Sequence, residues 1–452
     1  MKRTKAEIIA AIKANPSNKV RLAVSDIDGV LRGKVVHKEK LLSIIEGGFG
    51  FCSVVFGWDI ADVSYDNGSF TGWHNGYPDT KAALVLDSFR TIPWDNDTPF
   101  FLADFRTDEG ADLAICPRGL LKKVKQQCLE MGFQPFFSQE FEWFNFEETP
   151  KSFAAKGSVN PTPLTPGMFG YSILRSTEKA PFFNELFDLL CAFDIPIEGL
   201  HTETGPGVYE AAIMYGDVLE SADRAILFKT AVKEIAYRNG VIASFMAKWR
   251  ADLPGCSGHV HQSLWDDSSN LFYNQEDPDK MSDLMRSYIA GQLYCMPHIL
   301  PMFAPVINSY KRLVEGAWAP TTLTWGMDNR TTALRVLAGE SKSTRLETRV
   351  CGSDTNPYLA IAGCLASGLY GIKHGLKLEI PAVKGNGYLV KENGILPPTL
   401  RHATDNMKNS DIAKELFGET FVEHYTQTRE WEYRAYDKAV TDWEMQRYFE
   451  LI

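Results

Sequence analysis

The apolar run Phe136-Phe-Ser-Gln-Glu-Phe-Glu-Trp-Phe144 predicts a β-strand that carries two acids, Glu140 and Glu142. Residues two apart on a strand lie on the same side, so both carboxylates face one way, about 7 Å apart. Phe141 and Trp143 then pack behind them. Two like charges on an apolar strand are costly unless cations lie between them. Such a pair is also common on solvated strands, so a ligand site and a plain surface strand both stay open at this point.

Two further clusters follow along the chain. In the first, His201-Thr-Glu203 precedes a Thr-Gly-Pro-Gly turn and then Glu210, so a hairpin brings the two acids to one end; the alternative is a loop with solvated acids. In the second, Gly255-Cys-Ser-Gly-His259-Val-His261-Gln-Ser263 places two histidines on one strand face after a glycine bend. A pair of this kind is about as often a metal or phosphate site as a structural feature.

The cations lie later in the chain. In Arg345-Leu-Glu347-Thr-Arg349 an acid is flanked by two guanidinium groups on one strand face, which suits phosphate or carboxylate oxygens but also a structural salt-bridge ladder. The phosphate loop GxxxxGK[ST], a strand-anchored GxGxxG and HExxH are all missing from the sequence. Carboxylate pairs, one histidine ligand and several arginines together describe a phosphoryl-transfer site with two Mg²⁺ or Mn²⁺ ions. The other cations of this set are Arg312, Arg330, Arg335 and Lys342.

Composition limits the class of protein. At roughly 150 residues per domain, the 452 residues allow about three domains, or one large domain with a smaller companion. The net charge of −10 argues against a nucleic-acid surface. No apolar run is long enough to span a membrane, and the start of the chain lacks a continuous signal core, so we expect a cytoplasmic location. The eight cysteines are scattered without a CxxC pair, which indicates reduced thiols.

The pattern of apolar runs predicts a small α+β region up to about residue 110, and a second region that begins with a helix after Pro117. The last fifty or so residues are expected to be helical, with an aromatic stripe typical of core or subunit interface at Trp431, Tyr433, Tyr436, Trp443 and Tyr448. The expected helices are 5–14, 40–46, 120–131, 179–193, 216–239, 279–296 and 356–374, and the expected strands are 19–25, 50–55, 82–86, 135–145, 195–202, 207–214, 241–247, 257–264 and 343–350.

Taken in order, these motifs resemble the glutamine synthetase superfamily, type I, and within it the γ-glutamyl amine ligases. The resemblance covers almost the whole chain, and it includes Tyr310-Lys-Arg-Leu-Val314, Asn356-Pro-Tyr358 and the DxxGxxRGK pattern at Asp26–Lys34. It implies an α+β fold: a small N-terminal β-grasp-like domain, 1–112, and a large catalytic domain, 113–452, on a curved antiparallel sheet. It also implies a homo-oligomer of stacked hexameric rings with active sites between subunits.

The resemblance implies a role for each motif residue. ATP would phosphorylate the γ-carboxylate of glutamate, and an amine would then displace phosphate to leave an amide. The implied metal ligands are Glu142, Glu203 and Glu210 for one ion and Glu140, His259 and Glu347 for the other. The implied ATP contacts are Glu198, His261, Ser263, Lys342 and Arg345, the glutamate contacts are Gly255, Arg312 and Arg349, and Arg330 and Arg335 lie over the phosphates.

The departures from the family pattern concern the amine. Trp318 stands where glutamine synthetases present a flap glutamate that binds ammonium and takes its proton, and nearby Glu315 stands at a usual proline position. Asp59 is the best candidate for the ammonium-latch aspartate, and Pro254 replaces an asparagine of the glutamate loop. The tyrosine that is adenylylated in some bacterial enzymes is absent near Leu396-Pro-Pro, so that control is not expected.

Trp318 favours an apolar, even aromatic, amine. An aliphatic amine has a pKa of about 10, so it arrives as a cation and needs a carboxylate to bind it. Replacing that carboxylate by an indole favours a larger, more apolar or already neutral amine. The alternatives within the family are that Trp318 is only flap packing and that the protein is a glutamine synthetase using ammonia or a polyamine ligase.

Two alternatives come from other classes. Val24-Ser-Asp26-Ile-Asp28-Gly29 also resembles the aspartyl-phosphate motif of haloacid-dehalogenase-type phosphatases, but this leaves every later motif unexplained. Asp26→Asn should abolish activity in that case and only weaken it in a ligase. A non-catalytic, structural family member is the other alternative. It would lack metal ligands, whereas all six expected positions are filled in this chain.

Overall fold

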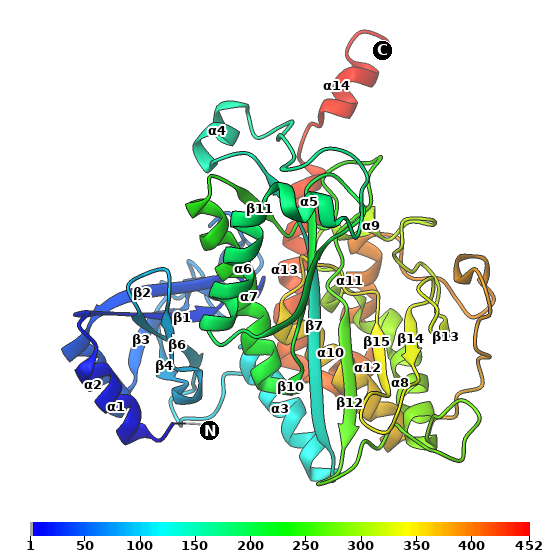
Figure 1. Ribbon diagram of the computed structural model, residues 1–452, viewed down its shortest axis with the longest axis horizontal. Coiled ribbons are helices and arrows are strands. Elements are labelled where there is room, and N and C mark those ends of the chain that lie inside the picture. The colour runs from blue at the N-terminus through cyan, green and yellow to red at the C-terminus, as the bar shows by residue number, and fades with distance from the viewer. Residues whose placement is uncertain (1–2) are drawn as a thin grey trace.

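Two curved β-sheets organise the chain, which a computed structural model describes over residues 3–452 (Figure 1). A small sheet near the N-terminus stands to one side of a larger, mainly antiparallel sheet, and helices cover one face of the larger sheet. The predicted α+β class, with a small β domain and a curved antiparallel sheet, is confirmed. The predicted boundary at residues 112/113 falls in the connection between β6 (Thr98–Phe105) and α3 (Pro117–Glu130), and it stays a prediction.

The small sheet has the strand order β2-β1-β6-β4-β3, with β5 on β6. β1 pairs with β6 in parallel and with β2 antiparallel. Two helices cover one face and bury Ile8, Ile12 and Leu41 against Val20 and Phe101. The helices are α1 (Lys5–Ala14) and α2 (Lys38–Gly47), and the strands are β1 (Lys19–Ser25), β2 (Leu31–His37), β3 (Phe49–Cys52), β4 (Asp79–Leu84), β5 (Arg90–Ile92) and β6.

The large sheet has the order β13-β14-β15-β12-β7-β9-β8, with β10 and β11 also paired to β7. Its central strand β7 contains the apolar run Phe136–Phe144, and Phe141 and Trp143 are fully buried behind it. The strands are β7 (Gln134–Phe146), β8 (Ile197–Thr202), β9 (Val208–Ile213), β10 (Gly216–Asp217), β11 (Ile242–Ser244), β12 (Val260–Trp265), β13 (Trp325–Met327), β14 (Leu334–Leu337) and β15 (Arg345–Thr348).

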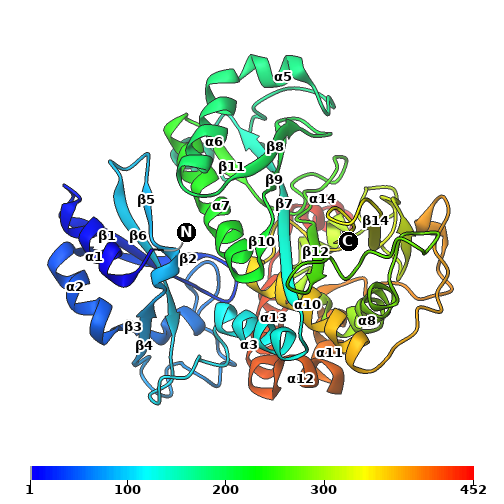
Figure 2. The same ribbon diagram turned by 60° about the horizontal axis from the view of Figure 1, so that its bottom comes forward.

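The helices behind this sheet form the main core. α10 packs on α8, α3 and α7, and Figure 2 shows α3, α10, α11, α12 and α13 gathered on one side of the strands. α8 and α10 approach closely because Gly371 has no Cβ: one there would lie 2.0 Å from the Ser287 carbonyl oxygen. The helices outside the small sheet, not all of which lie behind the large one, are α3, α4 (Pro150–Ala155), α5 (Ile173–Glu178), α6 (Ala180–Ala192), α7 (Val218–Arg238), α8 (Asp283–Ile299), α9 (Ser309–Arg312), α10 (Pro357–Lys373), α11 (Leu400–Lys408), α12 (Asp411–Phe417), α13 (Glu419–Asp437) and α14 (Asp442–Tyr448).

Helix α13 ties the small sheet to the rest of the molecule. The buried Arg429 pairs with Asp28, in the turn between β1 and β2, at 2.5 Å. Next to it, the Trp431 indole donates to Asp59 at 2.9 Å. Arg434, further along the same helix, pairs with Asp66. The first strands and the last long helix therefore share one polar interface.

Most expected elements are confirmed, some within a residue or two. Strands missing from the prediction include β2, β5, β6, β13 and β14. β2 was missed because this edge strand carries Arg32 and Lys34 and buries little surface. The helical C-terminus is confirmed, but the aromatic stripe is not core along its length, since Trp443 and Tyr448 are exposed; its interface role stays a prediction. Within residues 3–452, no helix is both long and apolar enough to cross a membrane.

Candidate active site

One face of the large sheet collects the predicted site residues. Across paired strands, Glu142 lies opposite Glu210, and His261 lies opposite Glu347. Arg335 in turn lies opposite Glu347 on the far side. Because paired residues of neighbouring strands project to the same face, alternation along each strand lines up acids, histidines and arginines on one surface.

The first acidic cluster forms at the predicted hairpin. β8 and β9 pair with His201 opposite Glu210, and one ligand atom each from His201, Glu203 and Glu210 lie within 4.8 Å of one another. Burial raises the pKa of Glu210 to about 7. The nearby Glu140 and Glu142 carboxylates also raise this pKa, whereas the contact with His201 lowers it. Burial also raises the pKa of Glu142 above its ordinary value, and the Glu203 and Glu140 carboxylates add to this effect. The cluster has more acids than the side chains around it neutralise.

The second cluster lies beside it, on β7, β12 and β15. The Nδ1 atom of His259 is 2.8 Å from Glu140 Oε1 and 3.2 Å from Glu347 Oε1. His261 Nε2 is 3.3 Å from the other Glu140 oxygen. Although burial opposes ionisation, His261 and His259 hold the pKa of Glu140 well below its ordinary value. Glu140, His261 and Glu347 also place one atom each within 4.8 Å of one another.

Both clusters fit divalent cations. They offer carboxylate oxygens and imidazole nitrogens, the ligands that Mg²⁺ and Mn²⁺ accept in proteins. The buried Nε2 of His259 has no hydrogen-bond partner among the described residues, which is costly for a buried polar atom unless a ligand completes it. Four of the six predicted metal ligands belong to these two groups, together with His201 and His261, which were not predicted as metal ligands. The other two lie beside them: Glu142 is opposite Glu210 on the paired strand, and His259 contacts Glu140 and Glu347.

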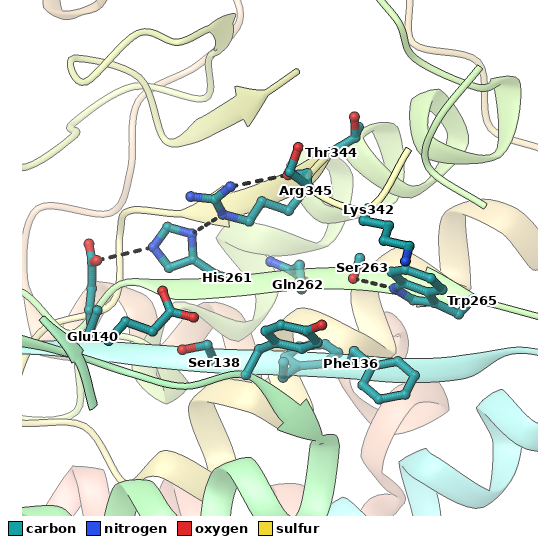
Figure 3. Close-up of a pocket in the computed structure, with 15 residues that line it drawn as sticks. Phe136, Ser138, Glu140, His261, Gln262, Ser263, Trp265, Lys342, Thr344 and Arg345 are labelled. Atoms are coloured by element: carbon teal, nitrogen blue, oxygen red, sulfur yellow. Dashed lines mark hydrogen bonds and ion pairs between the residues drawn. The ribbon is translucent and has the colours of Figure 1, made fainter. Parts of the chain in front are cut away.

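The predicted nucleotide residues line one cavity of about 290 Å³ next to the second cluster (Figure 3). Arg345 reaches toward His261, with its Nε 3.4 Å from the ring nitrogen. Trp265 and Phe136 stack edge to face, with ring centroids 5.9 Å apart, and give the cavity an aromatic end. The predicted contacts in the lining are Glu198, His261, Ser263, Lys342 and Arg345.

A β-bulge explains how Glu198 comes to line the nucleotide cavity. The register of β8 shifts between Ile197 and Gly199, so strict alternation no longer holds there. Such a bulge re-aims a side chain, and Glu198 lines the cavity together with residues of β7 and β12. Alternation counted back from His201 would have turned Glu198 to the opposite face.

The arginines connect the clusters to the predicted glutamate site. The buried Glu347 carboxylate accepts from Arg335, at 2.9 Å, and from Arg349. Arg349 also donates to the backbone oxygen of Arg330, whose own side chain is exposed. Buried Arg312 donates to the carbonyl oxygens of Val350 and Arg349, and its Nε has no partner among the described residues. Gly255 lies against Arg312, since a Cβ there would come 2.8 Å from Arg312 Cγ.

Trp318 lines a separate cavity of about 530 Å³, together with Met327 and Arg330. Its backbone has a φ of 59°, and 58% of the residue is exposed. Glu315 is not in the lining and instead pairs with Lys391 at 2.6 Å. The remaining sides of the cavity are formed by Asp328, Asn329, Thr331, Ala382, Val383, Lys384 and Gly385.

Asp59 lies apart from these groups within one chain. Its Oδ1 accepts from the amides of Ala61 and Val63, and its Oδ2 accepts from Trp431. No contact with the metal-site residues is found among the described side chains, so a role at a neighbouring subunit's site stays a prediction.

Asp26 is placed as a structural residue. It is 2% exposed, its Oδ1 accepts from the amides of Asp28 and Val30, and its Oδ2 pairs with Arg32 at 2.9 Å. A nucleophile that forms an aspartyl phosphate must reach its substrate. The phosphatase alternative therefore has no support in this geometry.

Two further site residues, Tyr171 and Trp265, belong to none of the predicted motifs. Tyr171 stacks on His201 with ring centroids 4.6 Å apart, and it comes from the loop before α5, which carries no motif. Trp265 continues the alternation of His261 and Ser263 by two residues, so the same period-two pattern could have found it.

Comparisons with known proteins agree with the motifs. A sequence model described as glutamine synthetase, catalytic domain, matches residues 114–448. Type-1 glutamine synthetase 2 of Dictyostelium discoideum is 53% identical over 450 residues, which are 98% of this chain and 86% of that protein. Glutamate–isopropylamine ligase of a Pseudomonas species is 36% identical and covers 96% of this chain and 95% of its own.

Two further matches are another amine ligase and a solved structure. Gamma-glutamylethanolamide synthetase of Streptomyces coelicolor is 34% identical, over 98% of this chain and 95% of its own. A solved structure titled as a complex of GmaS with ADP superposes with a TM-score of 0.86 at 24% identity, over 99% of this chain and 100% of that one, which shows a shared fold. The matched relatives thus include both a glutamine synthetase and amine ligases.

Proposed function

Because this chain belongs to the glutamine synthetase family of ATP-dependent ligases, we propose that it joins the γ-carboxylate of L-glutamate to an amine through a γ-glutamyl phosphate. The observation that carries this proposal is the single sheet face on which both acidic clusters, the nucleotide cavity and the arginines meet. The products would be a γ-glutamyl amide, ADP and phosphate.

Different residues of the chain would bind the metal ions, the phosphoryl group and glutamate. Glu142, Glu203 and Glu210 would hold one Mg²⁺ or Mn²⁺ ion and Glu140, His259 and Glu347 a second, and these ions supply positive charge that offsets the phosphate oxygens. Arg330 and Arg335 would stabilise the phosphoryl group as it moves from ATP to the carboxylate. Arg312 and Arg349, with Gly255 leaving room, would orient glutamate. Arg335 and Arg349 are already fixed by Glu347, so their guanidinium groups need little reorganisation.

The aromatic end of the nucleotide cavity would hold the adenine ring. Trp265→Ala removes one aromatic wall and should raise the KM for ATP about tenfold, because base–aromatic stacking contributes about 1 to 3 kcal/mol. The KM for glutamate should stay within twofold. Initial-rate kinetics with each substrate varied in turn would measure both constants. An unchanged KM for ATP would place the base elsewhere.

Trp318 supports an apolar amine as the acceptor. Among the relatives, glutamate–isopropylamine ligase is named for an alkyl amine, and the type-1 glutamine synthetase supports ammonia as the second candidate. Trp318→Glu restores the flap acid and should raise kcat/KM for ammonium at least about tenfold relative to an alkyl amine or aniline. Steady-state rates of phosphate release with each amine test this. A ratio that does not move would make Trp318 a packing residue.

A panel of amines tests the function itself. The purified full chain would be incubated with ATP, Mg²⁺, glutamate and one amine at a time, with mass detection of the γ-glutamyl product. We expect a product with at least one alkyl or aryl amine, formed faster than glutamine. Glutamine as the faster product would favour the ammonia-using alternative. Absence of glutamate-dependent ADP formation with every amine would favour a non-catalytic family member.

The assembly is also part of the proposal. A homo-oligomer of stacked hexameric rings would cover exposed apolar side chains such as Ile173, Leu174 and those of α14, including Trp443. Light scattering of the purified protein would give its mass.

A further inference from the structure

We propose that the cavity beside Trp318 is the acceptor-amine pocket and that Asp328 is the carboxylate in it that binds the ammonium group. This inference rests on the proposed function and names the site of its second substrate. It concerns a residue for which the sequence motifs gave no role. Asp328 lies between β13 and β14, next to the predicted phosphate-binding Arg330.

The lining of this cavity suits an amine with an apolar body. Trp318, Met327 and Val383 supply apolar surface, and the volume of about 530 Å³ leaves room for a substituent on the nitrogen. Asp328 is the one carboxylate among the residues that line the cavity in the described part of the chain. A cationic amine that enters here therefore meets a single negative charge.

The carboxylate of Asp328 is available and connected to the reaction centre. Arg335 donates to its Oδ1 from Nε, at 2.9 Å, and from Nη2, while the side chain stays 72% exposed. Both contacts use the same oxygen, which leaves the Oδ2 side of an exposed carboxylate open to a ligand. Arg335 also donates to Glu347, so one guanidinium group spans from the cavity to the second acidic cluster. An amine held at Asp328 is thus one side chain away from the place where the phosphoryl group is transferred.

The other two acids that could bind the amine, Glu315 and Asp59, fit this role less well. Glu315 is paired with Lys391 and does not line the cavity. Asp59 is engaged by two amides and Trp431. Asp328 therefore offers a physical substitute for the carboxylate that Trp318 displaces from the flap.

The charges around the cavity also set the kind of amine. Arg330 and Lys384 line the cavity as well, so a second ammonium group on the same molecule would meet cations rather than acids. A monoamine with one apolar substituent fits, whereas a polyamine gains nothing from the pocket. The substrate class is therefore a primary alkyl monoamine or a neutral arylamine.

The bond changes balance with this assignment. The amine nitrogen attacks the acyl carbon of γ-glutamyl phosphate, the C–N bond forms, and the C–O bond to phosphate breaks with its electron pair going to phosphate. An alkylammonium ion loses two protons on the way to the amide. The first passes to Asp328 and on to solvent, and the second leaves with the phosphate.

The test is Asp328→Asn in the full-length protein, assayed with an alkyl monoamine. Asparagine tolerates the φ of 46° at this position and keeps an oxygen for Arg335, so the backbone and the arginine are preserved. We expect the KM for the alkyl amine to rise about tenfold, which corresponds to about 1.4 kcal/mol, with the KM values for ATP and glutamate unchanged. Hydroxylamine, which is neutral at pH 7, should react as in the parent protein. The matched control Glu315→Gln removes a nearby acid outside the cavity and should leave the amine KM unchanged.

Two results with Asp328→Asn would overturn the inference. An unchanged amine KM in Asp328→Asn overturns the inference. An equal loss in ADP formation with glutamate and no amine would also overturn it, because Asp328 would then act by positioning Arg335. A second variant, Val383→Trp, fills the cavity without changing charge, and it should lower kcat/KM for alkyl amines but not for hydroxylamine. If the parent protein forms no glutamyl product with any amine or with hydroxylamine, the proposed function itself fails.

Discussion

Replacing Glu347 by glutamine is expected to lower kcat about a thousandfold, equivalent to about 4 kcal/mol of transition-state stabilisation. Glu347 is fully buried, and its carboxylate accepts from Arg335 and Arg349 and contacts His259. Glutamine keeps the shape but removes the charge that holds both guanidinium groups in place. It also removes an oxygen ligand for the proposed second metal ion. Both effects act on the phosphoryl group, so phosphate release with saturating ATP, glutamate and amine is the measurement.

The control for this variant is Glu379→Gln, which removes an exposed acid that lines neither the nucleotide cavity nor the cavity beside Trp318. Circular dichroism of Glu347→Gln must match the parent protein, because two buried guanidinium groups lose their common partner and some stability with it. A folded variant that retains more than about a tenth of the parental kcat would show that phosphoryl transfer does not depend on the Glu347 charge.

The second large effect concerns stability. Asp28→Asn should lower the free energy of unfolding by about 3 kcal/mol, because Arg429 is 2% exposed and would be left as a buried charge without its anion. Chemical denaturation followed by far-UV circular dichroism would measure it. The matched control is Asp62→Asn: Asp62 also pairs with an arginine, Arg32, but its side chain is 53% exposed, so its loss should cost under about 1 kcal/mol. Equal effects of the two variants would mean that burial of the Asp28–Arg429 pair adds nothing to stability.

Local patterns account for what the sequence could predict. Alternation along β7 and β12 placed Glu140, Glu142, His259 and His261 on one face, and the structure brings them together there. The glycine turn after Glu203 predicted the hairpin that closes the first cluster, and the hairpin is confirmed. The assignment of particular residues to each metal ion, to ATP and to glutamate stays a prediction.

Other features depend on contacts that no local pattern carries. In the run Ile195–Leu200, the bulge that turns Glu198 into the nucleotide cavity is marked only by Gly199, and an isolated glycine does not fix which side chain a bulge re-aims. The cavity beside Trp318 is closed by Val383, from a segment far along the chain without regular structure. The sequence could not identify Asp328 as a site residue. Its proposed role depends on its contact with Arg335 and on the cavity that it shares with the distant residue Val383, and not on a motif.

The interface on helix α13 can form only after this helix has been synthesised, long after the small sheet. Asp28 and Arg429 are 401 residues apart in the chain, so a ribosome that adds about 5 to 20 residues per second delivers the arginine about 20 to 80 s after the aspartate. During that interval the small sheet can form its own strands and helices, but its acids Asp28, Asp59 and Asp66 lack the side chains of α13 that bind them. The small sheet and α13 are therefore joined only after α13 has been synthesised.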